Sequence, residues 1–246
     1  MTYCIGLKLN RGLVMMSDTR TNAGVDNISM YKKMFTWEIK GERVISIMTA
    51  GNLATTQAVV GMLEERMKIA DERTPSILKA KTMFQVAQLV GQTLKEVITN
   101  ATNGQEGSTG TFGASIIVAG QIEGGNPCIF MIYPEGNFIE ASDDTPFLQI
   151  GETKYGRPIL VRAYDPEMSF EDAVKLLMVS FDSTIKANLS VGLPLDMLIY
   201  KTDALEIERA ARIGADDPQY RVISSGWGDA LRSAFSSLPD VDLSKI

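Results

Sequence analysis

Residues Thr2 to Asp18 read TYCIGLKLNRGLVMMSD, and this segment sets the architecture of the chain. Its apolar character predicts a strand over Thr2–Leu9 and a returning strand over Leu13–Ser17. The intervening Asn10-Arg11-Gly12 is typical of a hairpin turn. A hairpin of this length brings Asp18, at the end of the second strand, near Thr2.

The rest of the chain carries further strand and helix signals. Apolar residues spaced along one helical face, or apolar runs bounded by turn residues, define each segment. Strands are expected over Lys33–Ile39, Val44–Thr49, Phe112–Ala119, Cys128–Tyr133, Asn137–Glu140 and Leu195–Lys201. Helices are expected over Asn52–Ala70, Met83–Ala101, Ser169–Lys186 and, near the end, about Trp227–Ser237. This order predicts the α+β class, with two antiparallel sheets packed face to face and flanked by helices, in a single domain spanning residues 1–246.

Composition excludes several functional classes. The chain has 246 residues, is 45% hydrophobic and carries a net charge of −6. An acidic chain repels phosphate backbones, so no nucleic-acid partner is expected. No basic segment followed by an apolar run opens the chain, and no apolar stretch is long enough to span a bilayer. With Cys4 and Cys128 as the two cysteines, we expect a cytoplasmic protein with reduced thiols and no membrane association.

The absence of histidine constrains the chemistry further. Ser-His-Asp and Cys-His catalysis need imidazole as the base. Two distant cysteines without histidine do not make a zinc site, and the sequence has no G-x-x-x-x-G-K-[ST] loop for nucleotide phosphates. We therefore expect no metal and no cofactor. A catalytic base would have to be a lysine, a carboxylate or the α-amine of the chain.

Thr2 can supply both a nucleophile and a base. Removal of Met1 would expose it, and an α-amine with a pKa of ~7.7–8.0 can take the proton of the residue's own hydroxyl near neutral pH. Nucleophile and base then belong to one residue, so no histidine is needed as the base. A small residue at position 2 is common by itself, so this interpretation depends on the residues expected around it.

Three further residues support the interpretation. Asp18 ends the strand paired with the N-terminal strand, and Lys33 begins the next strand. A lysine beside a hydroxyl favours the alkoxide, and an aspartate can hold that lysine in place. Gly51, in Thr49-Ala50-Gly51-Asn52, stands where a strand ends and a helix starts, so its N–H is a candidate oxyanion donor. Taken singly, Asp18 could cap a turn and Lys33 could be a solvated edge lysine, but their joint spacing with Thr2 favours a catalytic role.

The order and spacing of these residues are similar to the pattern of proteasome β-subunits. The similarity includes Thr2, Ser17-Asp18-Thr19-Arg20, Lys32-Lys33-Met34, Ala50-Gly51, Pro134-Glu135-Gly136 and Ser190-Val191-Gly192. The chain resembles more closely the bacterial proteasome homologues of the Anbu branch. That likeness rests on Ser-Asp-Thr-Arg-Thr-Asn-Ala-Gly-Val-Asp at 17–26, Asn-Leu-Ser-Val-Gly-Leu-Pro at 188–194 and Trp-Gly-Asp-Ala-Leu-Arg from 227. Residues from about 202 to 246 would form the C-terminal extension typical of this branch.

The resemblance implies the four-layer αββα fold of N-terminal-nucleophile hydrolases and a threonine peptidase or amidohydrolase that cleaves amide bonds. The implied catalytic residues are Thr2, Asp18, Lys33, Gly51 and Ser190. The implied substrate-binding residues, which would contact an extended peptide or a small amide, are Thr21, Asn22 and Thr49. Self-assembly into a homo-oligomeric ring or open spiral is also implied. The alternative is a non-catalytic, self-assembling shell with the same N-terminal geometry. Independently of that choice, Ser190 could be a cap of the third helix or a loop residue.

The chain departs from the β-subunit pattern at two places. Where the family has a serine after a glycine, this chain has Gly151 followed by Glu152 and Thr153, either of which would take the serine's place. The family's aspartate is replaced by Ala187, and the neighbouring Asn188 is a candidate to substitute as an uncharged orienting group. The missing aspartate concerns proton handling at the amine, and it motivates the alternative of a shell.

Overall fold

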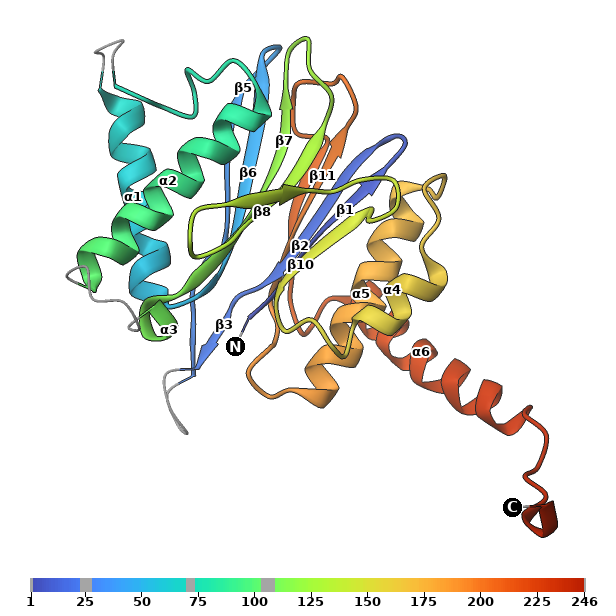
Figure 1. Ribbon diagram of the computed structural model, residues 1–246. Coiled ribbons are helices and arrows are strands. Elements are labelled where there is room, and N and C mark those ends of the chain that lie inside the picture. Colours follow the sequence, from blue (N-terminus) through green and yellow to red (C-terminus); the bar gives the residue numbers. More distant parts are fainter. Residues whose placement is uncertain (1, 23–27, 70–73, 103–108, 246) are drawn as a thin grey trace.

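The computed structural model describes residues 2–22, 28–69, 74–102 and 109–245. Met1 and residues 23–26 of the motif at 17–26 lie outside the described residues. Two five-stranded antiparallel sheets form the centre of the molecule (Figure 1). In spatial order, the first sheet consists of β10 (Phe147–Gly151), β1 (Tyr3–Leu9), β2 (Gly12–Asp18), β11 (Leu195–Lys201) and β12 (Arg209–Ile213). The second consists of β5 (Met34–Ile39), β6 (Arg43–Gly51), β7 (Ala114–Ile122), β8 (Cys128–Ile132) and β9 (Phe138–Glu140).

Helices cover the outer face of each sheet (Figure 1). The second sheet is covered by α1 (Leu53–Lys68) and α2 (Met83–Ala101), and the first by α4 (Arg157–Ala163) and α5 (Phe170–Ala187). The remaining elements are the single turn α3 (Thr109–Phe112), α6 (Pro218–Ser236), a 3-10 turn at Leu243–Lys245, and the short pair β3 (Arg20–Asn22) and β4 (Ile28–Met30). The four layers confirm the αββα fold. No helix among the described residues is both long enough and apolar enough to cross a membrane.

Both faces of the central strands are buried, which explains why they read as continuous apolar runs. Successive side chains of a strand point to opposite faces of the sheet. In β2, Val14 and Met16 pack in the core beneath α5, whereas Leu13 and Met15 pack in the core between the two sheets. The fold therefore has three apolar cores, one between each pair of adjacent layers.

The N-terminal hairpin forms as predicted. Cys4 pairs with Ser17 across β1 and β2, so the chain returns with Asp18 beside the first residues of β1. The Tyr3 N–H donates to the Asp18 carboxylate over 3.0 Å. This contact confirms that the hairpin brings Asp18 to the N-terminal end of the chain.

Several element boundaries differ from the sequence prediction. The strand expected over Phe112–Ala119 begins only at Ala114, because Phe112 belongs to the short turn α3. The last helix was expected near Trp227 but starts at Pro218, where Asp217 caps it by accepting from the Tyr220 N–H. This Asp-Pro pair is a helix-start signal that the prediction overlooked. The elements β3, β4, β10, α4 and β12 were not predicted.

Candidate active site

A cavity of about 210 Å³ opens at the N-terminal end of β1. Most of the residues predicted for the site line it, and they come from segments far apart in the sequence. The lining includes the predicted residues Thr2, Thr21, Lys33, Thr49 and Gly51, together with Ala50, Leu53, Thr56 and Gly151. Thr2 is 8% exposed and therefore sits in a largely enclosed position.

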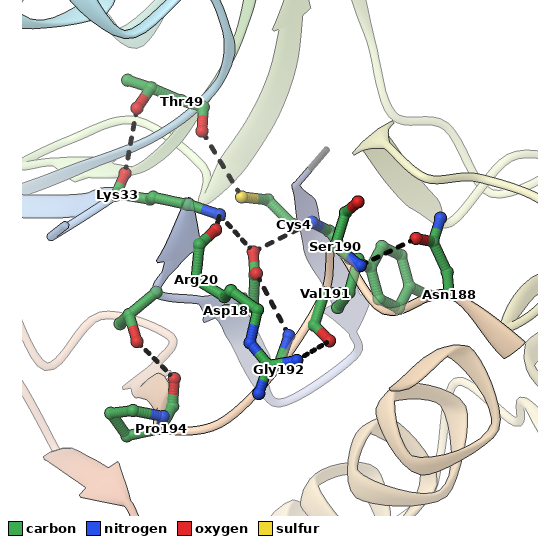
Figure 2. Close-up of polar contacts among 12 residues, drawn as sticks. Cys4, Asp18, Arg20, Lys33, Thr49, Asn188, Ser190, Val191, Gly192 and Pro194 are labelled. Atoms are coloured by element: carbon green, nitrogen blue, oxygen red, sulfur yellow. Dashed lines mark hydrogen bonds and ion pairs between the residues drawn. The ribbon is translucent and has the colours of Figure 1, made fainter. Parts of the chain in front are cut away.

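A buried ion pair borders this cavity. The Lys33 ammonium lies 2.7 Å from an Asp18 carboxylate oxygen and donates to the Arg20 carbonyl over 2.5 Å. The exposed fractions are 4% for Lys33 and 0% for Asp18. Figure 2 shows the Lys33 side chain reaching toward Asp18, while the segment through Ser190 and Gly192 lies on the other side of the carboxylate. Lys33 is thus not a solvated edge lysine but a charge held in a fixed place.

Backbone groups complete the surroundings of Asp18. Its carboxylate accepts from the Tyr3 N–H at 3.0 Å and from the Gly192 N–H at 3.4 Å. Burial raises the pKa of the Asp18 carboxyl, whereas Lys33 and the two backbone N–H groups act in the opposite direction by favouring the carboxylate. The interpretation of Asp18 as a simple turn cap is therefore wrong, because the group links β1, Lys33 and the segment before β11.

The raised pKa of Asp18 gives a testable pH dependence of stability. A carboxyl whose pKa is higher in the folded chain than in the unfolded chain stabilises the fold when it is protonated. This contribution is complete below the unfolded pKa of ~3.9 and is lost as the pH rises through the folded pKa. As the pH rises above about 4, we expect the native chain to lose stability relative to Asp18→Asn. Urea unfolding of both chains at a series of pH values measures this loss, and a difference that moves in favour of the native chain would contradict the assignment.

Thr2 is positioned through its own backbone by the end of β10. Its carbonyl accepts from the Glu152 N–H at 2.6 Å, and Tyr3 pairs with Gly151 across β1 and β10. Gly151 has a φ of +84°, and a Cβ added there would lie 2.0 Å from the Thr2 carbonyl oxygen. Only glycine allows this close approach. Sequence reasoning did not assign Gly151 to the site, although its place directly before Glu152 in the family-like motif was a usable signal.

Gly51 also lines the cavity, at the residue where β6 ends. A Cβ added there would lie 2.5 Å from the Gly113 carbonyl oxygen, so the strand end is packed closely against the chain entering β7. The next residue, Asn52, begins α1 by accepting from the Thr55 N–H. The predicted strand-to-helix junction is therefore present, and Gly51 faces the same cavity as Thr2.

Ser190 and Asn22 are the remaining residues predicted for the site. Ser190 is not among the residues that line the cavity, and its N–H donates to the Asn188 side chain at 3.0 Å. It belongs to the segment that reaches Asp18 through Gly192. The backbone of Asn22 ends β3 beside the lining residue Thr21, and its side chain lies outside the described residues.

The structure distinguishes the two candidates for the place of the family's serine. Thr153 is exposed, whereas Glu152 is 7% exposed and follows Gly151 directly beside Thr2. The Glu152 carboxylate accepts from the Asn188 side-chain amide at 3.0 Å. The two departures from the family pattern are therefore in contact with each other.

Comparison with known proteins identifies the class that this fold and site define. The family model described as "Proteasome subunit" matches residues 2–197, and the chain belongs to that family. The proteasome subunit beta of Haloquadratum walsbyi is 23% identical over 207 residues, which span 84% of this chain and 76% of the relative.

Solved Anbu structures are similar over nearly the whole chain. Anbu from Hyphomicrobium sp. strain MC1 is 47% identical with a TM-score of 0.90, and the match covers 98% of this chain and 100% of the other. The helical assembly of the Anbu complex from Pseudomonas aeruginosa provides a chain that is 42% identical with a TM-score of 0.90, covering 98% and 99% of the two chains. These matches confirm the resemblance to the Anbu branch that the motifs indicated.

Proposed function

We propose that the protein is an N-terminal-threonine hydrolase that cleaves amide bonds in extended peptides or small amides, with Thr2 exposed by removal of Met1. The observation that carries this proposal is the buried Lys33–Asp18 pair at the cavity that Thr2 lines. A buried ion pair adds little to stability compared with a well-packed apolar pair. Its retention beside an enclosed hydroxyl favours a chemical role for the lysine charge.

The proposed reaction begins at the Thr2 hydroxyl. Its oxygen bonds to the carbonyl carbon of the scissile amide while its proton passes to the α-amine, directly or through water. The Lys33 ammonium stabilises the alkoxide character of the oxygen, and the Gly51 N–H stabilises the tetrahedral oxyanion. The carbon–nitrogen bond then breaks, and the α-ammonium returns its proton to the departing amine. Water hydrolyses the remaining ester to the acid and regenerates the threonine.

Strand pairing suggests how an extended peptide would bind. β5 pairs with β6 only as far as Met48, whereas β7 pairs with β6 up to Gly51. Beyond Thr49, whose N–H donates to the Lys33 carbonyl, that side of β6 has no neighbouring strand in the described residues. β3 is paired with β4 on one side, and its Thr21 lines the same cavity as Gly51. We propose that the peptide adds to these two edges by main-chain hydrogen bonds.

Self-assembly is the second part of the proposal. Several large apolar side chains of α6 and the segment after it are exposed: Val222, Leu231, Phe235, Leu238, Val241 and Leu243. Figure 1 shows α6 projecting away from the two sheets. We propose that the chain forms a homo-oligomeric ring or open spiral in the cytoplasm, as a single domain with residues from about 202 to 246 as an extension. The helical assembly of the Anbu chain from Pseudomonas aeruginosa supports this proposal.

The decisive experiment is intact mass spectrometry before and after incubation with a peptide epoxyketone. This reagent requires the free amine and the hydroxyl of an N-terminal threonine. We expect loss of the Met1 mass, one adduct per chain, and no adduct in Thr2→Ala, because that substitution removes the attacking oxygen. Sedimentation of Thr2→Ala should match that of the native chain, since a single hydroxyl in the cavity does not hold the fold together.

Two other outcomes would separate the competing functions. Retained Met1 without an adduct would overturn the hydrolase and favour the non-catalytic shell. For such a shell, Thr2→Ala should leave the sedimentation of the assembly unchanged. Loss of Met1 without an adduct would show that an exposed threonine is not sufficient, and it would direct attention to the replacements at Glu152 and Ala187.

A further inference from the structure

Glu152 is a buried carboxylate whose partners in the described residues are neutral. One of its oxygens accepts from the Lys154 N–H at 2.9 Å, and the other accepts from the Asn188 side-chain amide at 3.0 Å. The whole residue is 7% exposed. Burying a carboxylate is costly unless a charge or several hydrogen bonds compensate. The two neutral donors do not cancel the charge of Glu152, so a cation beside the carboxylate would stabilise it.

Glu152 lies next to Thr2, which would be the first residue once Met1 is removed. Its N–H donates to the Thr2 carbonyl at 2.6 Å, and its side-chain partner Asn188 accepts from Ser190 in the segment that binds Asp18 through Gly192. Burial raises the pKa of the Tyr3 hydroxyl to about 12, and the Glu152 carboxylate adds to this effect. The negative charge of Glu152 thus acts on the residue that follows Thr2.

The charges of the neighbouring groups indicate which cation could pair with Glu152. Lys33 and Asp18 neutralise each other. Thr2 is uncharged at its nitrogen while it is linked to Met1, and removal of Met1 creates a positive charge at an 8% exposed residue. We propose that the Glu152 carboxylate, held by Asn188, is the counter-ion that binds and orients the α-ammonium of Thr2. This assignment rests on the proposed function only in requiring that Met1 is removed.

The consequence concerns the base in the reaction. A carboxylate beside the ammonium stabilises its protonated form, so the free amine becomes available at a higher pH than it would without Glu152. The elements and connecting segments around Thr2 also carry other charged or titratable side chains: Tyr3, Cys4, Asp18, Arg20, Lys33, Lys154, Arg157, Asp182 and Lys186. Of these, Asp18 and Lys33 are paired with each other, and Asp182 is paired with Lys186. Glu152 then tunes the chain toward activity under alkaline conditions.

The test measures the amine itself rather than turnover. The full chain is produced behind a cleavable partner whose removal leaves Thr2 first, and intact mass verifies that start. Trace acetylation with acetic anhydride between about pH 5 and pH 10, read on the N-terminal peptide by mass spectrometry, then gives the pKa of the α-amine. We expect Glu152→Gln to lower this pKa by about one unit relative to the native chain.

Controls separate the local charge from folding and from net charge. Glu152→Ser must give a shift in the same direction, which keeps the test valid if the glutamine variant misfolds. Glu171→Gln removes the same charge from the exposed first turn of α5, at the end of the helix opposite Asn188, and must leave the pKa unchanged. Circular dichroism and thermal melting confirm that each variant is folded.

The outcomes are distinct from those of the hydrolase test. An amine pKa that stays within about 0.3 units of the native value, or rises, in folded Glu152→Gln and Glu152→Ser would overturn the counter-ion. A lowered pKa in both, without an epoxyketone adduct in any variant, would establish the counter-ion while removing the hydrolase. If adducts form, the pH dependence of their rate must move to lower pH in both Glu152 variants.

Discussion

Lys33→Met will abolish adduct formation and turnover and will lower the free energy of unfolding by about 3–5 kcal/mol at neutral pH. The variant retains an apolar stem of similar length but leaves Asp18, which is 0% exposed, without its ammonium partner. At the size of this chain, a loss of that magnitude lowers the melting temperature by about 10 °C. Differential scanning calorimetry and urea unfolding measure the stability, and epoxyketone labelling measures the chemistry.

The double variant Asp18→Asn with Lys33→Met separates these two effects. An asparagine can still accept from the Tyr3 N–H, and the double variant buries no unpaired charge. Most of the stability should return, whereas labelling of Thr2 should remain absent because no ammonium favours the alkoxide. Recovery of labelling in the double variant would contradict the role of Lys33. In Lys33→Met alone, the stability loss should shrink on acidification, since protonation removes the unpaired charge of Asp18.

The second large effect is expected for Gly151→Ala. A methyl group there would lie 2.0 Å from the Thr2 carbonyl oxygen and 3.3 Å from the Thr2 Cβ, both on the residue that we propose as the nucleophile. The start of β1 must then move, and a displacement of about 1 Å at a reacting group can cost about 100-fold in rate. We therefore expect epoxyketone labelling to slow at least about 100-fold. A positive φ adds a stability cost of roughly 1–2 kcal/mol for any residue with a Cβ.

Gly41→Ala is the matched control for this prediction. Gly41 also has a positive φ, +76°, but no heavy atom lies within 4 Å of an added Cβ. The variant should show a comparable backbone cost and an unchanged labelling rate. Equal loss of labelling in both variants would mean that general destabilisation, rather than displacement of Thr2, is responsible.

The proximity of Thr2 and Asp18 could be predicted from the sequence because one hairpin carries both residues. Lys33 lies beyond β3 and β4, just before β5 of the other sheet, so its place near them was indicated by the family-like spacing rather than by local structure. The length of that hairpin and its turn set the pairing register, and the structure pairs Cys4 with Ser17. The place of Gly51 could also be predicted, because a strand end followed by a helix cap is a local sequence signal. The four layers followed from the order of strands and helices and from the continuous apolar runs of strands buried on both faces.

The choice between Glu152 and Thr153 could not be made from the sequence. Adjacent residues at a strand end point to opposite sides, so a shift of one residue in the pairing of β10 with β1 exchanges them. The pairing of Tyr3 with Gly151 makes that choice. The closeness of Gly151 to the Thr2 carbonyl depends on the same register, and local sequence contains no information about it.

The chemistry proposed for Thr2 thus follows from local sequence: the missing histidine, Thr2 itself and the hairpin that carries Asp18 toward it. The tertiary structure alone decided what surrounds the amine of Thr2. The carboxylate of Glu152 meets the amide of Asn188 across 36 residues of sequence. The Glu152 N–H meets the Thr2 carbonyl because β10 pairs with β1, and Asn188 ends α5, which packs over the same sheet. Such contacts arise from packing between elements distant in the chain, which neither spacing nor periodicity determines.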